Sequence, residues 1–435
     1  MMLGGGSYTI QNKVLPGAYI NFVSVARANA ALSNRGVCAI PMPLNWGIDG
    51  EVFTVENSDF EKDSLKIFGY SYDANEVRNI REVFQNAKTL HIYRINSGEK
   101  ASNVYATARY SGTRGNDIKI VIQTNADDET KFDVITYLET AKVDTQTVTE
   151  AKELVANALV TFHTDAILEL TAGIELTGGS NLTTISGTQY QEALDKLESY
   201  SFNTLGCVSS SSTIKALYAA YTKRMREEVG VKFQTVIHGY PADYEGIINL
   251  KNKVTDEGVE ESALIYWTVG AQAGCAVNRS TTNQTYNGEY EVFTNYKQSE
   301  LNAAIEAGEY VFHKVGTEVR VLTDINSFVS FTNDKNSDFS INQVIRVLDQ
   351  MGNDIAVLFN TRYLGKIQNN ESGRVGFWND LVTYNKELET LNTIEGFQST
   401  DVTVEAGDDK RSVVVTNVVQ PVAAMEKLYM TVRVA

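Results

Sequence analysis

The chain has 435 residues, of which 43% are apolar and 21% charged, a balance typical of globular proteins and unlike that of disordered chains. This length suffices for roughly two to three domains, each with its own core. The 38 Lys and Arg residues are outnumbered by 54 Asp and Glu, and the net charge of −16 argues against nucleic acid and anionic lipid as partners.

Neither a membrane span nor a metal site is indicated. No window approaches the roughly eighteen uninterrupted apolar residues that a bilayer requires, and the start has no basic region followed by an apolar stretch. We therefore expect a soluble protein made in the cytoplasm. Cys38, Cys207 and Cys275 show no CxxC spacing, so we expect buried small hydrophobes and no disulfide or zinc site.

The first third of the chain begins as a parallel α/β unit. "PGAYINFVSV" (16–25) is rich in β-formers and predicts an extended segment. "RGVCAIPMPLNWG" (35–47) predicts a buried strand and a turn, apolar residues over 77–87 fall at helical spacing, and "TLHIYRI" (89–95) predicts a second strand. Together they indicate a β-α-β unit.

From about residue 96 to 187 the pattern changes. Alternating, Thr-rich segments predict strands, with one helix near 149–162, and the Gly-rich segment 178–187 is interpreted as the hinge at the end of an inserted domain. From residue 188 strands and helices alternate again. This alternation predicts a mainly parallel sheet with helices on both faces.

The last third contains a helix near 299–308, a hairpin over 309–325, and two long helical patterns over 340–366 and 374–393. Two strand-like runs then follow on either side of Pro421. The fold class expected for the whole chain is α/β, with a mixed-sheet core covered by helices on both faces, a β-rich inserted outer domain and extended terminal arms.

Histidines and serines offer no convincing catalytic group. His91, His163, His238 and His313 lie far apart without metal-binding spacing, so structural roles are expected for them. The serine cluster "VSSSSTIKAL" (208–217) follows a strand and opens a helix, so it could hold an anion, but an ordinary helix N-cap at its third or fourth serine explains it better.

Two other patterns also have structural explanations. "GAQAG" (270–274) places small residues four apart, which permits close helix packing as well as a cofactor role. Asp195 with Glu198, and Glu260 with Glu261, are paired carboxylates as in glycoside hydrolysis, but solvated helix faces account for them. Because no reaction emerges, a structural building block is favoured over the alternative, a hydrolase-like α/β enzyme whose active site escapes motif analysis.

Both chain ends suit pairing with another chain. In the closing "EKLYMTVRVA" (426–435), apolar and polar side chains alternate, which predicts a strand. A terminal strand with unpaired backbone groups can add to the sheet of a neighbour. The predicted inter-subunit strands comprise Tyr19, Ile20, Asn21 and Phe22 at one end and Leu428, Tyr429, Met430, Thr431, Val432, Arg433 and Val434 at the other.

Several segments, in this order, carry a resemblance that covers most of the chain: "LPGAYINF" (15–22), "VCAIPMPLNWG" (37–47), residues 68–96, "ARYSGTRGNDIKI" (108–120), "GGSNLTT" (178–184), residues 301–328 and the closing strand. The chain resembles the contractile tail sheath proteins of phages and phage-tail-like (R-type) bacteriocins. Two departures affect turns: Ser111 replaces a usual Pro, and residues 45–48 lack the usual Gly-Pro loop.

The resemblance implies a subunit of a hexameric, helically stacked sheath around an inner tube, which shortens to drive the tube through a bacterial envelope. The N-terminal arm would be residues 1–22 and the C-terminal arm 421–435, the core 23–95 and 188–420, and the outer domain 96–187. No catalysis and no cofactor are implied. A tail tube or baseplate subunit is a further alternative, disfavoured because tube proteins are usually much shorter.

The implied partners are other copies of the chain, the inner tail tube protein, and baseplate and tail terminator proteins, without nucleic acid or a membrane span. The implied location is the tail of a phage or phage-tail-like particle assembled in the bacterial host cytoplasm. A tube-facing helix must bind weakly enough to release. The late helices offer Arg362, Lys366, Arg374 and Lys386 as candidate tube contacts, or as ordinary solvated charges.

Overall fold

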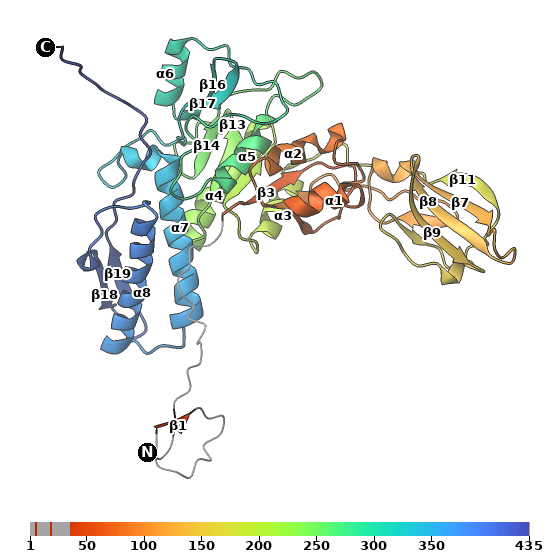
Figure 1. Cartoon of the computed structure of the whole chain (residues 1–435), viewed down its shortest axis with the longest axis horizontal. Helices are drawn as coiled ribbons and strands as arrows, with labels where there is room; N and C mark the ends of the chain where they lie inside the picture. Colours follow the sequence, from red (N-terminus) through yellow and green to blue (C-terminus); the bar gives the residue numbers. More distant parts are fainter. Residues whose placement is uncertain (1–4, 7–17, 20–34, 435) are drawn as a thin grey trace. The chain divides into compact units, whose positions relative to one another are not determined.

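The computed structural model describes residues 5–6, 18–19 and 35–434 (Figure 1). It divides into two compact units. The large unit comprises the described residues of 33–353, 389–396 and 420–435, and the small unit includes 354–388 and 397–419. Residues 188–420, which sequence analysis treats as one part of the core, therefore contribute to both units.

A seven-stranded sheet forms the centre of the large unit, in the order β15-β14-β13-β12-β3-β5-β4 (Figure 1). The neighbouring strands run parallel, except that β4 is antiparallel to β5. The bounds are β3 Val37–Met42, β4 Val52–Glu56, β5 Thr89–Arg94, β12 Thr204–Cys207, β13 Gln234–His238, β14 Ile247–Leu250 and β15 Glu309–Tyr310. The mixed sheet predicted from the sequence is confirmed.

Helices pack against both faces of this sheet, as predicted. Cys38 and Ile40 of β3 join one apolar core with residues of α1, α2 and α5, whereas Ala39, between them, joins a second core with α3 and α4. The alternation follows from the two-residue period of a strand. The bounds are α1 Asn57–Phe68, α2 Arg78–Phe84, α3 Gly187–Leu197, α4 Ser212–Arg224 and α5 Leu264–Gly274.

The close packing predicted for "GAQAG" is present between α2 and α5. A Cβ atom added to Gly270 would lie 2.2 Å from the carbonyl oxygen of Val83, and one added to Gly274 would lie 2.0 Å from that of Asn86. Larger residues at these two positions would force the helices apart. The glycines therefore have a packing role.

The inserted segment forms a four-stranded antiparallel sheet in the order β11-β7-β8-β9, with a separate strand pair, β6 and β10 (Figure 1). The bounds are β6 Ala106–Ala108, β7 Ile118–Thr124, β8 Phe132–Leu138, β9 Ala141–Val148, β10 Val160–Phe162 and β11 Thr171–Glu175. Ile118, Ile120, Ile122 and Val134 are buried in its own apolar core.

The helix predicted near 149–162 is wrong. Only a 3-10 turn, Ala151–Glu153, and strand β10 occur there. The Asn157 side chain accepts hydrogen bonds from the amides of Leu159 and Val160, at 2.9 Å each, and so holds a turn in the middle of the segment. This local side-chain pairing competes with a helix, a recognised property of Asn.

A buried arginine ties the inserted segment to the sheet. Arg94, at the end of β5, is 1% exposed and donates hydrogen bonds to Asp49 Oδ1 (3.0 Å), the carbonyl oxygen of Ser111 (2.8 Å) and Asn181 Oδ1 (2.9 Å). Ser111 donates to the same Asp49 carboxylate through its amide (3.0 Å) and its hydroxyl (2.7 Å). Because proline has no N–H, the serine makes a contact here that proline could not.

The later part of the large unit contains α6 (Gln298–Glu306), the predicted hairpin of β16 (Phe312–Val315) and β17 (Glu318–Val321), and the start of α7 (Asn342–Leu358). The small unit contains most of α8 (Glu371–Thr390) and the antiparallel hairpin of β18 (Val402–Ala406) and β19 (Val413–Asn417). Short strands β1 (Gly5–Gly6) and β2 (Ala18–Tyr19) pair with each other.

Short helices complete the described secondary structure. Five are 3-10 helices: Asn75–Val77, Thr113–Asp117, Ala151–Glu153, Ser337–Ser340 and Ser399–Asp401. Two are π-helical turns that extend α4 and α7: Met225–Val229 and Phe359–Tyr363. In the small unit, the rings of Phe359, Tyr363 and Phe377 pack together, with centroids 4.7 to 6.4 Å apart.

Candidate assembly interface

The C-terminal segment is attached to the large unit as far as Glu426. Pro421 bridges to Ile394, and the Ala424 amide donates to Gln343 Oε1 at 2.9 Å. The Glu426 carboxylate accepts hydrogen bonds from two threonine hydroxyls, those of Thr282 and Thr323. The sequence predicted an arm from residue 421, and the structure therefore divides that arm into an attached root (420–426) and a free part.

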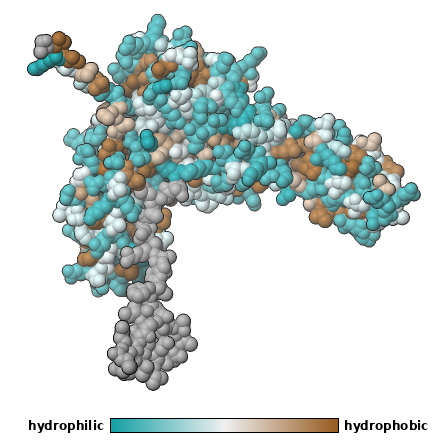
Figure 2. Space-filling view, in the orientation of Figure 1, coloured by the Kyte–Doolittle hydropathy of each residue, from teal (hydrophilic) through white to brown (hydrophobic). Residues whose placement is uncertain are grey.

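The free part, Leu428 to Val434, is called the arm strand. Its apolar side chains are bare: the exposed fractions are 84% for Leu428, 73% for Met430, 70% for Val432 and 93% for Val434. Among the described residues, the backbone from 427 to 434 makes no hydrogen bond to the rest of the chain. Figure 1 shows this segment extending without a covering element, and Figure 2 shows hydrophobic residues (brown) along it.

The N-terminal arm is described at two short places only. Tyr19 lies in β2, which pairs parallel with β1. The other predicted arm residues, Ile20, Asn21 and Phe22, lie outside the described residues. Their role stays a prediction.

The β18–β19 hairpin in the small unit is a sheet of only two strands. Its strands pair with each other and with no further strand among the described residues. Val414 and Val415 of β19 are exposed, at 53% and 37%. A two-stranded sheet is marginally stable alone, and its outer edges can accept another strand.

The four candidate tube-facing cations lie in two different settings. Arg362 pairs with Asp380, with Nη1 2.6 Å from Oδ2, and Arg374 donates to Asn369 Oδ1 at 3.0 Å. These two guanidinium groups thus have partners within the small unit.

Lys366 and Lys386 are exposed. Lys366 Nζ donates to the carbonyl oxygen of Thr361 at 2.6 Å, close to its own helix end. Lys386 lies on the solvent face of α8, whose exposed or half-buried side chains include Ser372, Val375, Asn379, Thr383 and Thr390. Apart from Lys386 this stripe is uncharged.

A large cavity lies at the carboxyl ends of β3 and β12. Its volume is about 700 Å³, and its lining includes Ser209, Ser210, Glu257, Glu260 and Arg78. No histidine or cysteine is among its lining residues, so the two serines have no imidazole base there. In residues 35–434 no group of three or more His, Cys, Asp or Glu side chains could hold a metal ion, and no described helix is long and apolar enough to cross a bilayer.

Two of the histidines contact threonine hydroxyls, and Cys38 and Cys207 are buried, whereas Cys275 is half-buried. His91 Nδ1 lies 2.9 Å from the Thr54 hydroxyl, and His163 Nε2 lies 2.8 Å from that of Thr107. Cys207 is buried as predicted, and this burial raises the pKa of its thiol to about 12. A thiol with that pKa is a poor nucleophile at neutral pH.

Four family models match consecutive parts of the chain. They are the tail sheath protein Gp18 domain III N-terminal region (residues 35–95), the phage tail sheath protein beta-sandwich domain (86–181), the phage tail sheath protein central domain (183–327) and the phage tail sheath C-terminal domain (334–435). Together they cover nearly all of the described chain.

Individual proteins agree with these matches. The chain is 34% identical to the phage-like element PBSX protein XkdK of Bacillus subtilis (strain 168), over 99% of this chain and all of that protein. Its structure is similar to the crystal structure of the sheath tail protein of Desulfitobacterium hafniense, with a TM-score of 0.83, 38% identity, and 95% and 99% of the two chains covered. It also shares the fold of the contracted helical sheath of the anti-feeding prophage, with a TM-score of 0.55 at 12% identity, over 97% and 99% of the chains.

Proposed function

The chain belongs to the phage tail sheath protein family and is a structural component of a phage or phage-tail-like particle, and we propose that it polymerises as stacked hexameric rings around an inner tube. Contraction of this sheath drives the tube through a bacterial envelope. The subunit assembles in the host cytoplasm, and its partners are further copies of itself, the tube, the baseplate and the tail terminator.

The bare arm strand is the observation that carries this proposal. Four large apolar side chains stand on alternate positions of an extended segment and are 70% to 93% exposed in their own subunit. Burying a side chain of this size contributes about 1.5 to 3 kcal/mol. A segment that leaves so much apolar surface in water is adapted to a partner, and its period of two fits a sheet.

The β18–β19 hairpin is the acceptor that the geometry favours. The hairpin has only two strands among the described residues, and its Val414 and Val415 side chains are exposed. The arm strand pairs with no strand of the described chain. Addition of an arm strand from another subunit would satisfy both, through backbone hydrogen bonds of about 0.5 to 1.5 kcal/mol each. A link repeated at every subunit without closing on itself produces a helical assembly.

We assign the tube contact to the exposed stripe of α8 around Lys386. Lys386 is exposed on this long helix, whereas Arg362 and Arg374 are half-buried. A single exposed ion pair is worth about 0.2 to 1 kcal/mol. Such a contact is weak enough to release when the sheath widens.

Contraction in this proposal consumes no nucleotide. The extended sheath is metastable, and repacking of the subunit bodies releases free energy while the arms keep neighbouring subunits connected. The subunit therefore needs strong links through its arms and weak links to the tube. The exposed arm strand and the sparsely charged α8 stripe match these two requirements.

Deletion of Lys427 to Ala435 tests the proposal. The truncated chain should keep its fold, because the backbone of residues 427–434 makes no hydrogen bond within the described part of the chain and the apolar side chains of the arm strand are exposed. It should fail to form regular sheaths by negative-stain microscopy. Normal sheaths from the truncated chain would refute the role of the arm. The enzyme alternative instead predicts a compact monomer or dimer that turns over a substrate, with no rods or tubes under any condition.

A further inference from the structure

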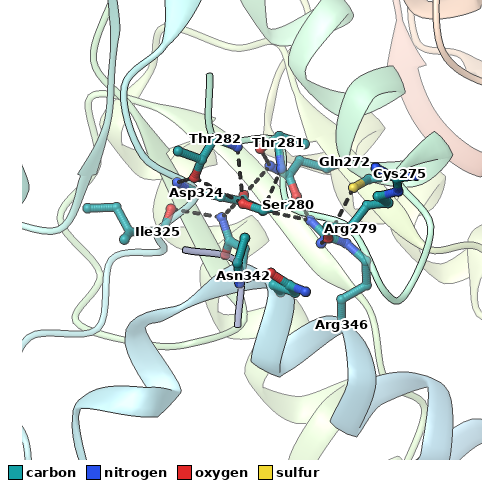
Figure 3. A network of polar contacts seen from close by, with 12 residues as sticks. Gln272, Cys275, Arg279, Ser280, Thr281, Thr282, Asp324, Ile325, Asn342 and Arg346 are labelled. Atoms are coloured by element: carbon teal, nitrogen blue, oxygen red, sulfur yellow. Dashed lines mark hydrogen bonds and ion pairs between the residues drawn. The ribbon is translucent and has the colours of Figure 1, made fainter. Parts of the chain in front are cut away.

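Buried polar side chains from several segments of the large unit form a hydrogen-bonded cluster (Figure 3). This arm-root cluster consists of Gln272, Thr281, Asp324, Asn342 and Arg346, each at most 2% exposed. Its members come from the end of α5, the loop after α5, the segment after β17 and the start of α7. The cluster thus joins four segments that are distant in sequence.

Asp324 is the centre of the arm-root cluster. Its carboxylate accepts hydrogen bonds from Gln272 Nε2 (2.8 Å), Asn342 Nδ2 (3.0 Å), Arg346 Nη2 (3.1 Å) and the amide of Thr281 (3.1 Å). Burial alone would raise the pKa of this carboxyl, but Arg346 and the hydrogen bonds outweigh burial and lower it. All four of these donors converge on one buried carboxylate, so the segments that carry them are held together at a single point.

The N-terminal side is tied to the cluster by Arg35, which precedes β3. Arg35 donates through Nε to the carbonyl oxygen of Cys275 (2.9 Å) and through Nη2 to that of Gln272 (3.1 Å). Both carbonyls lie at the C-terminal end of α5, where unpaired carbonyl groups favour a cation. The main chain that carries the Gln272 side chain is therefore also the attachment point of the N-terminal segment.

The C-terminal side is tied to the cluster by Glu426. Its Oε2 accepts from the Thr323 hydroxyl at 2.9 Å, and its Oε1 accepts from the Thr282 hydroxyl. The Thr282 hydroxyl oxygen in turn accepts from the amide of Asp324 at 2.9 Å. Residues beyond Glu426 form the bare arm strand, so this carboxylate is the last attachment before the arm leaves the body.

We propose that the arm-root cluster is the common anchor of the C-terminal arm and of the chain where it enters β3, so that tension on the arm passes to the N-terminal side of β3 through Glu426, Asp324, Gln272 and Arg35. This proposal rests on the proposed function, in which the arms link subunits. Glu426 acts as a positioning residue that fixes where the C-terminal arm leaves the body, and Arg35 as one that fixes the chain at the start of β3.

Hydrogen exchange of the free, full-length subunit tests the anchor without assembly. We expect Glu426→Ala and Arg35→Met each to increase exchange at the amides of Thr281 and Asp324 by about tenfold, because both variants release segments held by the cluster. The double variant should give less than the product of the two single effects, since coupled sites are not additive. Glu426→Gln keeps one acceptor oxygen and should give a smaller increase than Glu426→Ala.

Glu395→Ala is the matched control, because Glu395 accepts a hydrogen bond from Gln420 Nε2 at 2.7 Å in the same root but outside the cluster. It should leave the exchange of Thr281 and Asp324 unchanged. The common anchor would be overturned if Glu426→Ala increased hydrogen exchange only at residues 420–426. It would also be overturned if Glu395→Ala increased the exchange of Thr281 and Asp324 as much as Glu426→Ala does. The exchange result stands apart from the proposed function, which is tested separately by whether the wild-type chain forms a sheath with its tube and baseplate.

Discussion

Two single substitutions at adjacent positions of the arm strand distinguish the contribution of side-chain packing to assembly from that of backbone hydrogen bonding. Val432 belongs to the apolar face of the arm strand and Thr431 to the opposite face, and both are β-branched residues of similar volume. Val432→Thr places a hydroxyl on the face that we expect to be buried in a neighbour. Thr431→Val is the matched control on the other face and leaves β-propensity nearly unchanged.

The magnitude follows from the exposure of Val432 in the free subunit, which is 70%. Because the side chain is bare there, Val432→Thr should leave the melting temperature of the free subunit unchanged. Burying a hydroxyl without a hydrogen-bond partner in the sheath costs about 1 to 3 kcal/mol. Each subunit contact should weaken by that amount, which raises the critical concentration for assembly between about fivefold and 150-fold.

The assay is sedimentation of sheaths over a series of subunit concentrations in the presence of purified tube, with negative-stain microscopy of each pellet. Circular dichroism of the free subunit gives the melting temperature. Equal effects of Val432→Thr and Thr431→Val on assembly would refute the claim that only the apolar face of the arm strand is buried in a neighbouring subunit. A lower melting temperature for Val432→Thr would show that the arm strand packs on its own subunit.

Three further predictions concern other parts of the chain. Ser111→Ala removes a 2.7 Å hydrogen bond to the Asp49 carboxylate and should lower the free energy of unfolding, measured in urea, by about 1.5 to 3 kcal/mol. Ser111→Pro also removes the amide donor and should lower the free energy of unfolding further. The folded-state pKa of Asp324 is lowered from 3.8, so the stability that its ionised carboxylate contributes is complete above that value and is lost as the pH falls through the folded-state pKa. Asp324→Asn should therefore be less stable than wild type at pH 7, and the difference in thermal melts should shrink below about pH 4. Lys386→Glu should reduce tube binding in co-sedimentation several-fold, and an unchanged binding curve would exclude this tube contact.

Local periodicity predicted most of the core. The strands over 37–42 and 89–94, and the helix between them, are each recognisable from their own residues, and the parallel arrangement follows from their alternation. The edge strand Val52–Glu56 was missed although its side chains alternate between exposed and buried, and α1 was missed after it. The strand is only five residues long, and five of the twelve residues of α1 are charged, which weakened the apolar pattern.

Contacts between distant residues were beyond sequence analysis. Glu426 is 144 residues from Thr282 and 103 from Thr323, and no short motif marks any of the three. The alternation of the closing segment predicted a strand, but only the structure shows that its root is attached and its apolar side chains are bare. The helix predicted near 149–162 failed because a side-chain turn at Asn157 competes with helical periodicity.

Helical reconstruction of the assembled sheath by cryo-electron microscopy tests the central claim most directly. The account predicts that density for Leu428 to Val434 continues as a strand hydrogen-bonded to the β18–β19 hairpin of a neighbouring subunit, with Leu428, Met430, Val432 and Val434 buried. Density that places these residues on their own subunit, or leaves them unpaired on the surface of the sheath, would contradict it.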